Sequence, residues 1–372
     1  MSNFQASDAC ALPVRAAVAA LGWAEPERGQ VFAHWLQSLS GEFALHPASL
    51  RPASADASFR RYFRIDGVSG SFIVMDAPPD KENSEPFVRI AGLMAQAGLL
   101  VPRVLAWDAP QGFMLLDDLG SQTMMQELQD APAPRRQALF EQAIEALLRW
   151  QLASKPGLLP TYDQALLRRE MQLFPDWYIG QHKQLTLNAQ QHQQLQTVFD
   201  MLVTNNLAAP RVFVHRDFMP RNLMVPNDAH TQRLGVLDFQ DAVHGPLTYD
   251  IASLMRDAFA SWEEDFCLDI TVRYWQQARA AGLLDFEDWH SDFGAFYRSV
   301  EWMGLQRHLK VAGIFARLSL RDGKPKYLAD TPRFIGYMRA TASRYRELTP
   351  LLRLLDQIEG DKAITGFAFG RV

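Results

Sequence analysis

The sequence is poor in cysteine and has no long apolar segment. Two cysteines, Cys10 and Cys267, exclude a disulfide framework and a Cys-x-x-Cys site, and the nine histidines show no metal-ligand spacing. No apolar run approaches the roughly eighteen residues that a membrane-spanning helix needs. The first 22 residues also lack the basic start of a signal peptide. We therefore expect a cytoplasmic protein without a membrane partner.

The chain also lacks an excess of one charge. Its 42 acidic residues against 37 Lys and Arg give a formal charge of −5. This balance gives no reason to expect nucleic acid or an anionic membrane as a partner, and it leaves the oligomeric state open. What is present is a hydrophobic content of 48% over 372 residues, enough for two domains or lobes with their own cores.

Strand patterns dominate up to about residue 120. Alternating, aromatic-rich residues at 59–65 and apolar residues at 71–75 flank the turn Asp66-Gly67, which predicts a β-hairpin. Apolar spacing and short apolar runs predict the remaining elements, which are helices over 27–39 and 84–97 and strands over 101–107 and 113–116.

The helical period dominates after residue 120. Helices are predicted near 140–148, 195–202, 251–259, 266–280 and 296–309. We therefore expect an α+β chain in three parts. These are a small antiparallel-sheet N-lobe with an N-terminal helical extension over 1–115, a hinge over 116–121, and a larger, mainly helical C-lobe over 122–372.

The most informative motif is His215-Arg216-Asp217, with Asn222 and Asp238 behind it. Apolar residues 211–214 predict a strand that delivers Asp217 into a loop, and 222–225 with 234–237 predict a hairpin that returns Asp238 toward Asn222. Phosphoryl transfer from ATP needs a carboxylate to orient the acceptor hydroxyl, and an amide oxygen and a second carboxylate to hold Mg²⁺. We predict Asp217 as the catalytic residue and Asn222 and Asp238 as ligands of Mg²⁺.

Several longer segments resemble the aminoglycoside phosphotransferase and choline kinase superfamily, and within it most closely the N-acetylmuramate/N-acetylglucosamine anomeric kinases of bacterial cell-wall recycling. The segments that carry this resemblance are Asp56–Arg64, Val74–Pro79, Leu115–Gly120, Asp176–Tyr178, His215–Asn222 and Asp238–Ala242. The resemblance implies a bilobal protein-kinase-like fold that binds ATP and Mg²⁺ in a cleft.

The resemblance also implies roles for single residues. Asp250 and His215 are expected to support the catalytic loop, and Asp241 is expected to contact the substrate. Adenine is expected to meet the backbone of the hinge, at Leu115, Asp117 and Leu119.

The chain departs from protein kinases where phosphates are bound. Those enzymes use a glycine-rich loop and a lysine on the third strand. Here residues 53–58 contain no glycine, and Met75 and Asp76 stand where the lysine is expected. Three nucleotide-binding candidates follow: Ser58, Arg61 and Lys81. Each also has a simpler interpretation, as a turn residue for Ser58 and as a solvent-exposed cation for the other two.

An acceptor site is predicted from an aromatic cluster. Glu170, Phe174, Trp177 and Tyr178 share one helical face, which suits a sugar but equally suits core packing for Phe174 and Trp177. We take Glu170, Trp177, Tyr178 and Asp217 as substrate-binding candidates.

Two charged groups bear on the acceptor. Residues 257–301 are acid-rich, which suits either a polycationic antibiotic or a solvated face. A basic set suits the lactyl carboxylate of N-acetylmuramate or ordinary surface charge, and it comprises Arg307, Lys310, Arg317 and Arg321.

These features predict an ATP- and Mg²⁺-dependent kinase of an N-acetylated amino sugar, acting at the anomeric hydroxyl. Two alternatives stay open at this stage. One is a kinase of the same superfamily for an aminoglycoside or a small alcohol, and the other is a nucleotide-binding pseudokinase.

Overall fold

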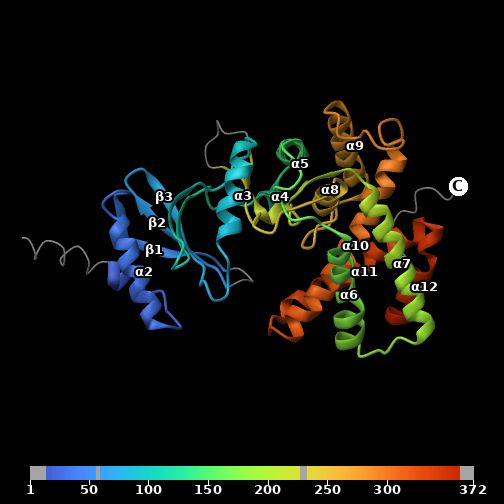
Figure 1. The fold of residues 1–372 in the computed structure, drawn as a ribbon, viewed down its shortest axis with the longest axis horizontal. Coiled ribbons are helices and arrows are strands. Elements are labelled where there is room, and N and C mark those ends of the chain that lie inside the picture. Colours follow the sequence, from blue (N-terminus) through green and yellow to red (C-terminus); the bar gives the residue numbers. More distant parts are fainter. Residues whose placement is uncertain (1–13, 56–58, 227–232, 361–372) are drawn as a thin grey trace, which may run out of the picture. The chain divides into compact units, whose positions relative to one another are not determined.

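The chain divides into two compact units (Figure 1). The computed structural model describes residues 14–55, 59–226 and 233–360. The first unit comprises the described residues of Met1–Gln122, Val225–Thr231 and Gly235–Gln240, and the second those of Thr123–Met224, Gln232–Leu234 and Asp241–Val372. The segment with Asp238 thus belongs to the first unit. The lobe and hinge ranges expected from the sequence stay a prediction.

The first unit is built on a five-stranded antiparallel sheet with the order β1-β2-β3-β5-β4. Its strands are β1 (Leu45–Ala55), β2 (Arg61–Gly67), β3 (Gly70–Asp76), β4 (Val104–Asp108) and β5 (Phe113–Asp117). The predicted hairpin is confirmed, with Tyr62 opposite Met75, but its turn lies at Val68-Ser69 and not at Asp66-Gly67, which belong to β2. Strand β1 was not predicted, because Pro47 and Pro52 interrupt its apolar pattern.

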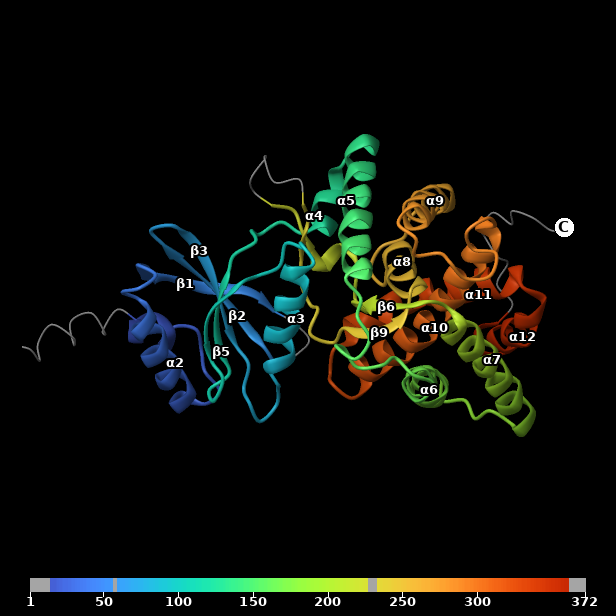
Figure 2. The same cartoon turned by 45° about the horizontal axis from the view of Figure 1, so that its top comes forward.

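Two helices lie on opposite sides of this sheet, α2 (Pro26–Leu39) and α3 (Glu85–Gln96) (Figures 1 and 2). Both confirm the predicted helices. On the α2 side, Phe32 and Leu36 are buried in one cluster with Phe63 and Ile65 of β2. Because strand residues alternate between faces, Tyr62 and Arg64 belong to the other face of β2.

An ion pair links α2 to the sheet. The Arg28 Nη2 atom lies 2.5 Å from Asp76 Oδ1 at the end of β3, and it also donates to the Gln111 carbonyl over 2.9 Å. The Asp76 side chain is 1% exposed. Burial raises the pKa of Asp76, while Arg28 opposes that rise. The residue that stands where a kinase lysine was expected therefore has a structural partner.

The second unit is mainly helical. Its helices of eight or more residues are α5 (Ala133–Leu152), α6 (Gln164–Leu173), the π-helix η1 (Phe174–His182), α7 (Ala189–Ala208), α8 (Thr248–Met255), α9 (Glu264–Ala280), α10 (Phe293–Leu320), α11 (Thr331–Arg344) and α12 (Thr349–Glu359). The shorter elements are α4 (Met124–Asp130), β6 (Arg211–Val214), η2 (Pro220–Asn222), β7 (Leu223–Met224), β9 (Val243–Pro246), η3 (Pro325–Asp330) and η4 (Arg346–Leu348), and β8 (Gly235–Val236) lies in the first unit.

Helix α10 forms the centre of the second unit, where it packs against α6, η1, α8 and α11. It approaches the end of α6 so closely that a Cβ atom on Gly313 would lie 2.3 Å from the Leu173 carbonyl oxygen. Only glycine allows this approach without movement of one of the two backbones. Among the described residues, no helix combines the length and the apolarity that crossing a bilayer would require.

Candidate active site

A two-stranded ladder delivers the His215 segment to its position. Strand β6 pairs antiparallel with β9, and Val212, Phe213 and Val214 of β6 are buried. The chain leaves this strand at His215, whose ring is also buried and lies near the ring of Phe218. A short buried strand therefore fixes where the following loop begins.

Asp250, on the first turn of α8, holds the backbone of that loop. Its Oδ2 atom accepts from the His215 N–H over 2.7 Å, and its Oδ1 atom accepts from the Arg216 N–H over 2.9 Å. Burial raises the pKa of Asp250 to about 6, against the lowering effect of His215 and of these two hydrogen bonds. The buried carboxylate thereby satisfies two backbone donors at the start of the loop.

Asp217 and Asn222 are brought together within the loop. The Asn222 Nδ2 atom donates to the Asp217 carbonyl over 2.9 Å, and the Asp217 N–H donates to His215 Nδ1 over 3.2 Å. The Asp217 side chain is 39% exposed, so its carboxylate is accessible to a ligand. Since Nδ2 is engaged by the backbone, the amide oxygen of Asn222 is oriented away from that bond.

A buried arginine lies beside the Asp217 carboxylate. Arg307 Nη2, from the middle of α10, is 3.7 Å from Asp217 Oδ1 and donates to the Arg216 carbonyl over 3.3 Å. Its side chain is only 3% exposed. The sequence placed Arg307 in a basic set without linking it to Asp217. The link depends on a contact across about ninety residues of chain, which spacing does not reveal.

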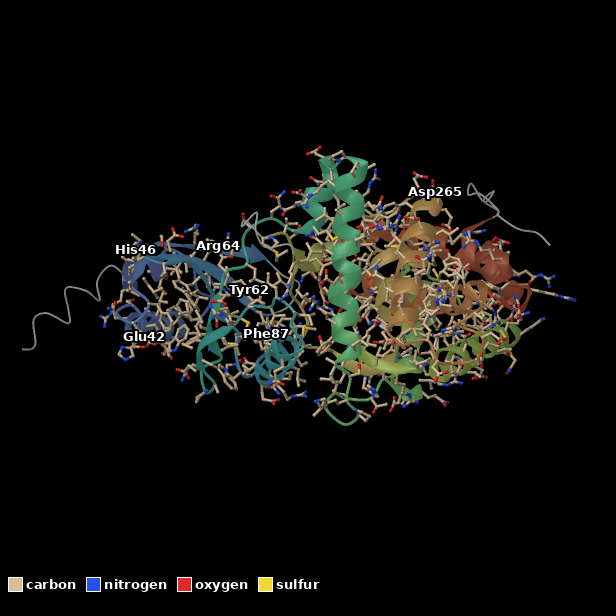
Figure 3. All side chains as sticks on the ribbon, turned by 90° about the horizontal axis from the view of Figure 1, so that it is seen from above. Glu42, His46, Tyr62, Arg64, Phe87 and Asp265 are labelled. Carbon is tan, nitrogen blue, oxygen red and sulfur yellow. The ribbon has the colours of Figure 1, made fainter. Side chains whose placement is uncertain are left out.

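Asp238 lies in the first unit, in the segment that α3 supports. Its backbone has a φ of +63°, and its Oδ1 atom accepts from Gln240 Nε2 over 2.8 Å. The neighbouring Phe239 is fully buried and packs against Phe87 of α3, with ring centroids 4.9 Å apart. Figure 3 marks Phe87 together with Tyr62 and Arg64 of β2. The convergence of Asp238 with Asp217 and Asn222 stays a prediction.

The donor set suits magnesium. The described residues contain no group of three or more His, Cys, Asp or Glu side chains that would enclose a metal by themselves. Magnesium usually takes one or two protein oxygens and completes its shell with phosphates and water. The predicted ligands Asn222 and Asp238 offer an amide oxygen and a carboxylate, which are donor types that magnesium takes.

The comparison with family models decides the class of this chain. A model described as the phosphotransferase enzyme family matches residues 49–291. The chain belongs to this family.

Known relatives of this phosphotransferase are similar over most of their length. A protein of Pseudomonas aeruginosa named N-acetylmuramate/N-acetylglucosamine kinase is 51% identical over 314 residues, which are 83% of this chain and 88% of the relative. A protein of the same name from Neisseria meningitidis is 47% identical over 339 residues, 90% of this chain and 98% of the relative.

Solved structures share the fold of the phosphotransferase. The ADP-bound aminoglycoside phosphotransferase APH(2'')-Ib gives a TM-score of 0.54 at 15% identity, with 81% of this chain and 96% of that one covered. An ethanolamine kinase of Plasmodium vivax gives 0.57 at 11% identity, with coverages of 87% and 90%. The bilobal α+β, kinase-like fold expected from the sequence is thereby confirmed.

The geometry argues against a direct sugar contact by Glu170. This side chain is buried, and its carboxylate accepts from Tyr162 and Gln306. It also pairs with Arg216 Nη2 at 2.5 Å and with Lys310 Nζ at 3.1 Å. Burial would raise its pKa, but the two cations prevail and lower it to about 2. Glu170 thus holds the side chain of Arg216 beneath the loop.

The aromatic candidates mostly pack inside the second unit. Tyr178 is buried, stacks on Phe174 with ring centroids 5.3 Å apart, and donates to Glu359 Oε1 over 2.7 Å. Core packing therefore accounts for Phe174, as the alternative interpretation held, and also for Tyr178, to which that interpretation did not extend. Trp177 is half-buried. Asp241 is exposed, and its carbonyl accepts from Arg216 Nη1 over 3.4 Å.

The two charged groups expected near the acceptor are divided between interior and surface. Arg307 and Lys310 are buried, whereas Arg317 is half-buried and Arg321 is exposed and paired with Asp322. In the acid-rich stretch, Asp257 is buried and accepts from two backbone N–H groups. Glu264 and Glu301 both pair with Arg344. Neither group forms one continuous surface.

Arg61 contradicts its predicted role. Its guanidinium stacks over the ring of Trp23 at 4.3 Å and donates to the Gly22 carbonyl over 3.1 Å, on the α2 side of the sheet. Alternation correctly placed Arg61 with Phe63 on one face, but α2 covers that face. Lys81 is exposed and lies 5.3 Å over the ring of Phe59. Ser58 lies outside the described residues.

The hinge candidates differ among themselves. Leu115 is opposite Val74 on one side and Ala106 on the other, so its backbone is engaged in the middle of the sheet, contrary to the prediction. Asp117 ends β5 and forms an ion pair with Arg103. Leu119 follows the sheet and is half-buried.

The sequence prediction missed Asp118. It accepts from Arg64 and Ser71, and from the Gly120 N–H over 3.0 Å. The signal was the repeated aspartate in Leu116-Asp117-Asp118-Leu119, in which Asp117 pairs with Arg103 and Asp118 with Arg64.

Proposed function

We propose that this chain transfers the γ-phosphoryl group of ATP to the anomeric hydroxyl at C1 of N-acetylmuramate and N-acetylglucosamine, as part of peptidoglycan recycling. The main support for phosphoryl transfer is the geometry of the loop. The Asp217 carboxylate is accessible, and the buried Asp250 carboxylate fixes the backbone just before it through two hydrogen bonds. The names of the relatives from Pseudomonas aeruginosa and Neisseria meningitidis support the choice of acceptor. Use of ATP agrees with the cytoplasmic location expected from the sequence.

In this proposal Asp217 orients the C1 hydroxyl and takes its proton. The C1 oxygen then forms a bond to the γ-phosphorus, the bond from that phosphorus to the β–γ bridging oxygen breaks, and ADP leaves. When Mg²⁺ is bound, it offsets the negative charge of the phosphates. Asn222 and Asp238 would hold it through their side-chain oxygens. Arg307 keeps a fixed positive charge beside Asp217 during the proton transfer.

Phosphorus NMR on the products from a panel of acceptors tests the proposal. The panel contains N-acetylmuramate, N-acetylglucosamine, kanamycin, ethanolamine and choline, each supplied with ATP and Mg²⁺. We expect an anomeric phosphate from the two N-acetylated sugars and none when the C1 hydroxyl is methylated.

Two results would contradict the proposal. Preferential turnover of kanamycin or an amino alcohol would favour the aminoglycoside or small-alcohol kinase. ATP binding without any phosphorylated product would favour the pseudokinase.

A further inference from the structure

In the first unit, the face of the sheet opposite α2 carries an arginine that was not among the nucleotide-binding candidates. Arg60 immediately precedes β2, so alternation places it on the same side as Tyr62 and Arg64 and opposite Arg61. Its side chain is only 8% exposed, although it stands next to the loop that joins β1 to β2. A buried cation needs an anion nearby.

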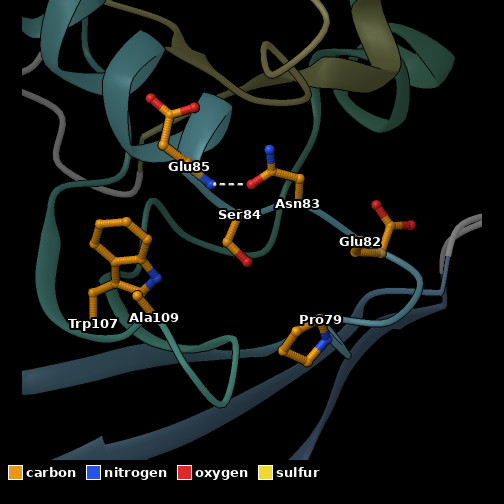
Figure 4. A pocket seen from close by; sticks show the side chains of 7 residues that line it. All are labelled: Pro79, Glu82, Asn83, Ser84, Glu85, Trp107 and Ala109. Carbon is orange, nitrogen blue, oxygen red and sulfur yellow. Dashed lines mark hydrogen bonds between the residues drawn. The ribbon is translucent and has the colours of Figure 1, made fainter.

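Glu82 supplies that anion. Its Oε2 atom lies 3.0 Å from Arg60 Nη2, while its Oε1 atom accepts from the Phe59 N–H over 3.2 Å. The side chain of Glu82 is 16% exposed. It lies three residues before α3 and lines an open pocket of about 260 Å³ with Ser84, Trp107 and other residues of this unit (Figure 4). One carboxylate therefore holds both the arginine and the backbone at the end of the β1–β2 loop.

The same region of the first unit carries Asp238. Helix α3 begins just after Glu82, and its Phe87 packs against Phe239, the residue that follows Asp238. Arg60 thus contacts Glu82, which precedes α3 in the chain, and α3 in turn contacts the segment that holds Asp238. Protein kinases place the strand lysine, a glutamate of the neighbouring helix and a metal-binding aspartate in this relation.

Other basic side chains of the first unit have different partners. Arg28 of α2 is paired with Asp76, and Arg61 of β2 stacks on Trp23, both on the α2 side. Arg51 of β1 pairs with Asp66. Arg64 shares the face of Arg60 but donates to Asp118 and to the Gly120 carbonyl. These contacts leave the Arg60 and Glu82 pair as the counterpart of the kinase lysine and glutamate.

We propose that Arg60 supplies the positive charge that faces the α- and β-phosphates of a nucleoside di- or triphosphate, and that Glu82 positions it. This inference rests on the proposed function, because it assumes that the first unit binds a nucleotide. Arginine suits the role, since its planar guanidinium donates to phosphate oxygens and to a carboxylate at the same time.

Calorimetric titration of the full chain with ADP and with adenosine tests the role of Arg60. The variants are R60M, R60K and E82Q, and the matched control is R61M, which removes the adjacent arginine from the opposite face. R60M should weaken ADP binding by about 10- to 100-fold, the range for a lost hydrogen bond to a charged group. Its affinity for adenosine should not change, because adenosine has no phosphate.

The remaining variants separate positioning from folding. R60K should bind ADP more tightly than R60M does, and E82Q should bind it about 3- to 10-fold more weakly than the wild type. R61M should bind ADP as the wild type does. If R60M fails to fold by circular dichroism, R60K and E82Q carry the test through their ratio of ADP to adenosine affinity.

Three results would overturn the inference. They are unchanged ADP binding by R60M, an equal loss for ADP and adenosine, and a loss in R61M as large as that in R60M. A wild-type chain that does not bind ADP refutes the proposed function and this inference together. Wild-type ADP binding with an unaffected R60M refutes the inference alone.

Discussion

Arg216 shows how much the candidate site depends on single side chains. Its backbone has a φ of +78°, a left-handed conformation that costs a residue with a Cβ atom on the order of 1–2 kcal/mol. The buried Asp250 carboxylate accepts from its N–H, and the Glu170 carboxylate, which also pairs with Lys310, accepts from its guanidinium. These contacts keep a non-glycine residue in this conformation directly before Asp217.

Replacement of Asp217 tests the proposed chemistry at this scale. Asp217→Asn retains the size of the side chain but cannot accept the proton, so kcat should fall by a factor of about 10² to 10⁴. The fold should be unaffected, because the side chain is accessible and its backbone bonds remain. Steady-state kinetics with N-acetylglucosamine and circular dichroism measure the two effects. Turnover within a factor of two of the wild type would remove Asp217 from its proposed role.

Glu170 should make the free energy of unfolding depend on pH in the acid range. Because Lys310 and Arg216 hold its folded-state pKa at about 2, below the ordinary 4.5, the charged carboxylate stabilises the fold above pH 4.5. That contribution, about 3 kcal/mol, should be lost as the pH falls from 4.5 toward 2. Urea unfolding at pH 7 and pH 3 should show a smaller acid effect for Glu170→Gln than for the wild type.

A matched variant controls for general acid effects. Glu145 lies on the surface of α5 in an i,i+4 pair with Arg149, so Glu145→Gln should keep the wild-type acid dependence to within about 0.5 kcal/mol. Equal acid dependence in wild type and Glu170→Gln would contradict the buried network.

At the scale of elements, α10 connects the parts of the second unit. It presents buried polar residues, including Gln306, Arg307 and Lys310, toward the loop region, and it contacts α6 through a glycine. A helix near 296–309 was predicted, but α10 extends to Leu320, and the buried position of its charged residues was not predicted. Charges on a helix normally indicate a solvated face, and only the packing of Glu170 and Asp217 against them shows otherwise.

Two glycines on this helix should respond in opposite ways to the same change. Gly313→Ala should destabilise by about 1–3 kcal/mol, because its methyl group would overlap the Leu173 carbonyl. Gly304→Ala meets nothing closer than 3.9 Å and should stabilise by up to about 1 kcal/mol through helix propensity. Urea unfolding measures both free energies, and a stabilised Gly313→Ala would refute the close packing of α10 on α6.

The attachment of α2 to the sheet should be equally sensitive to a single substitution. Arg28→Met leaves the buried Asp76 carboxylate without its cation and should destabilise the chain by about 3–5 kcal/mol. Arg51→Met removes an arginine from a pair with Asp66 in which both side chains are more than 40% exposed, so it should cost less than about 1 kcal/mol. Thermal unfolding compares the two variants. Equal shifts in Tm would show that the buried Arg28 pair contributes no more to stability than the exposed Arg51 pair.

At the scale of the whole molecule, ligand binding should report on the proposed metal ligand. ADP with Mg²⁺ at about 100 times its Kd should raise the free energy of unfolding by about 2.7 kcal/mol. In Asp238→Asn, most of the Mg²⁺-dependent part of this stabilisation should be lost. The control Asp265→Asn has the same charge change on the exposed start of α9 and should keep it. Equal Mg²⁺ dependence in both variants would exclude Asp238 as a ligand.

Local patterns predicted the class of fold and the outline of the loop. Periodicity found most helices and the β2–β3 hairpin because each depends on neighbours in sequence. The expectations at Glu170, Arg61 and Leu115 differ from the observed contacts because side-chain or strand partners lie far away in the chain. Alternation gave the correct face for Arg61, but sequence did not show that α2 covers that face.

The ion pair between α2 and β3 also restricts how this protein can change. A lysine introduced at position 76 by a single substitution would meet the guanidinium of Arg28 in a buried place, with two like charges and no anion between them. A change at position 28 alone would leave the Asp76 carboxylate buried without its cation, so a basic residue at position 76 requires both positions to change together.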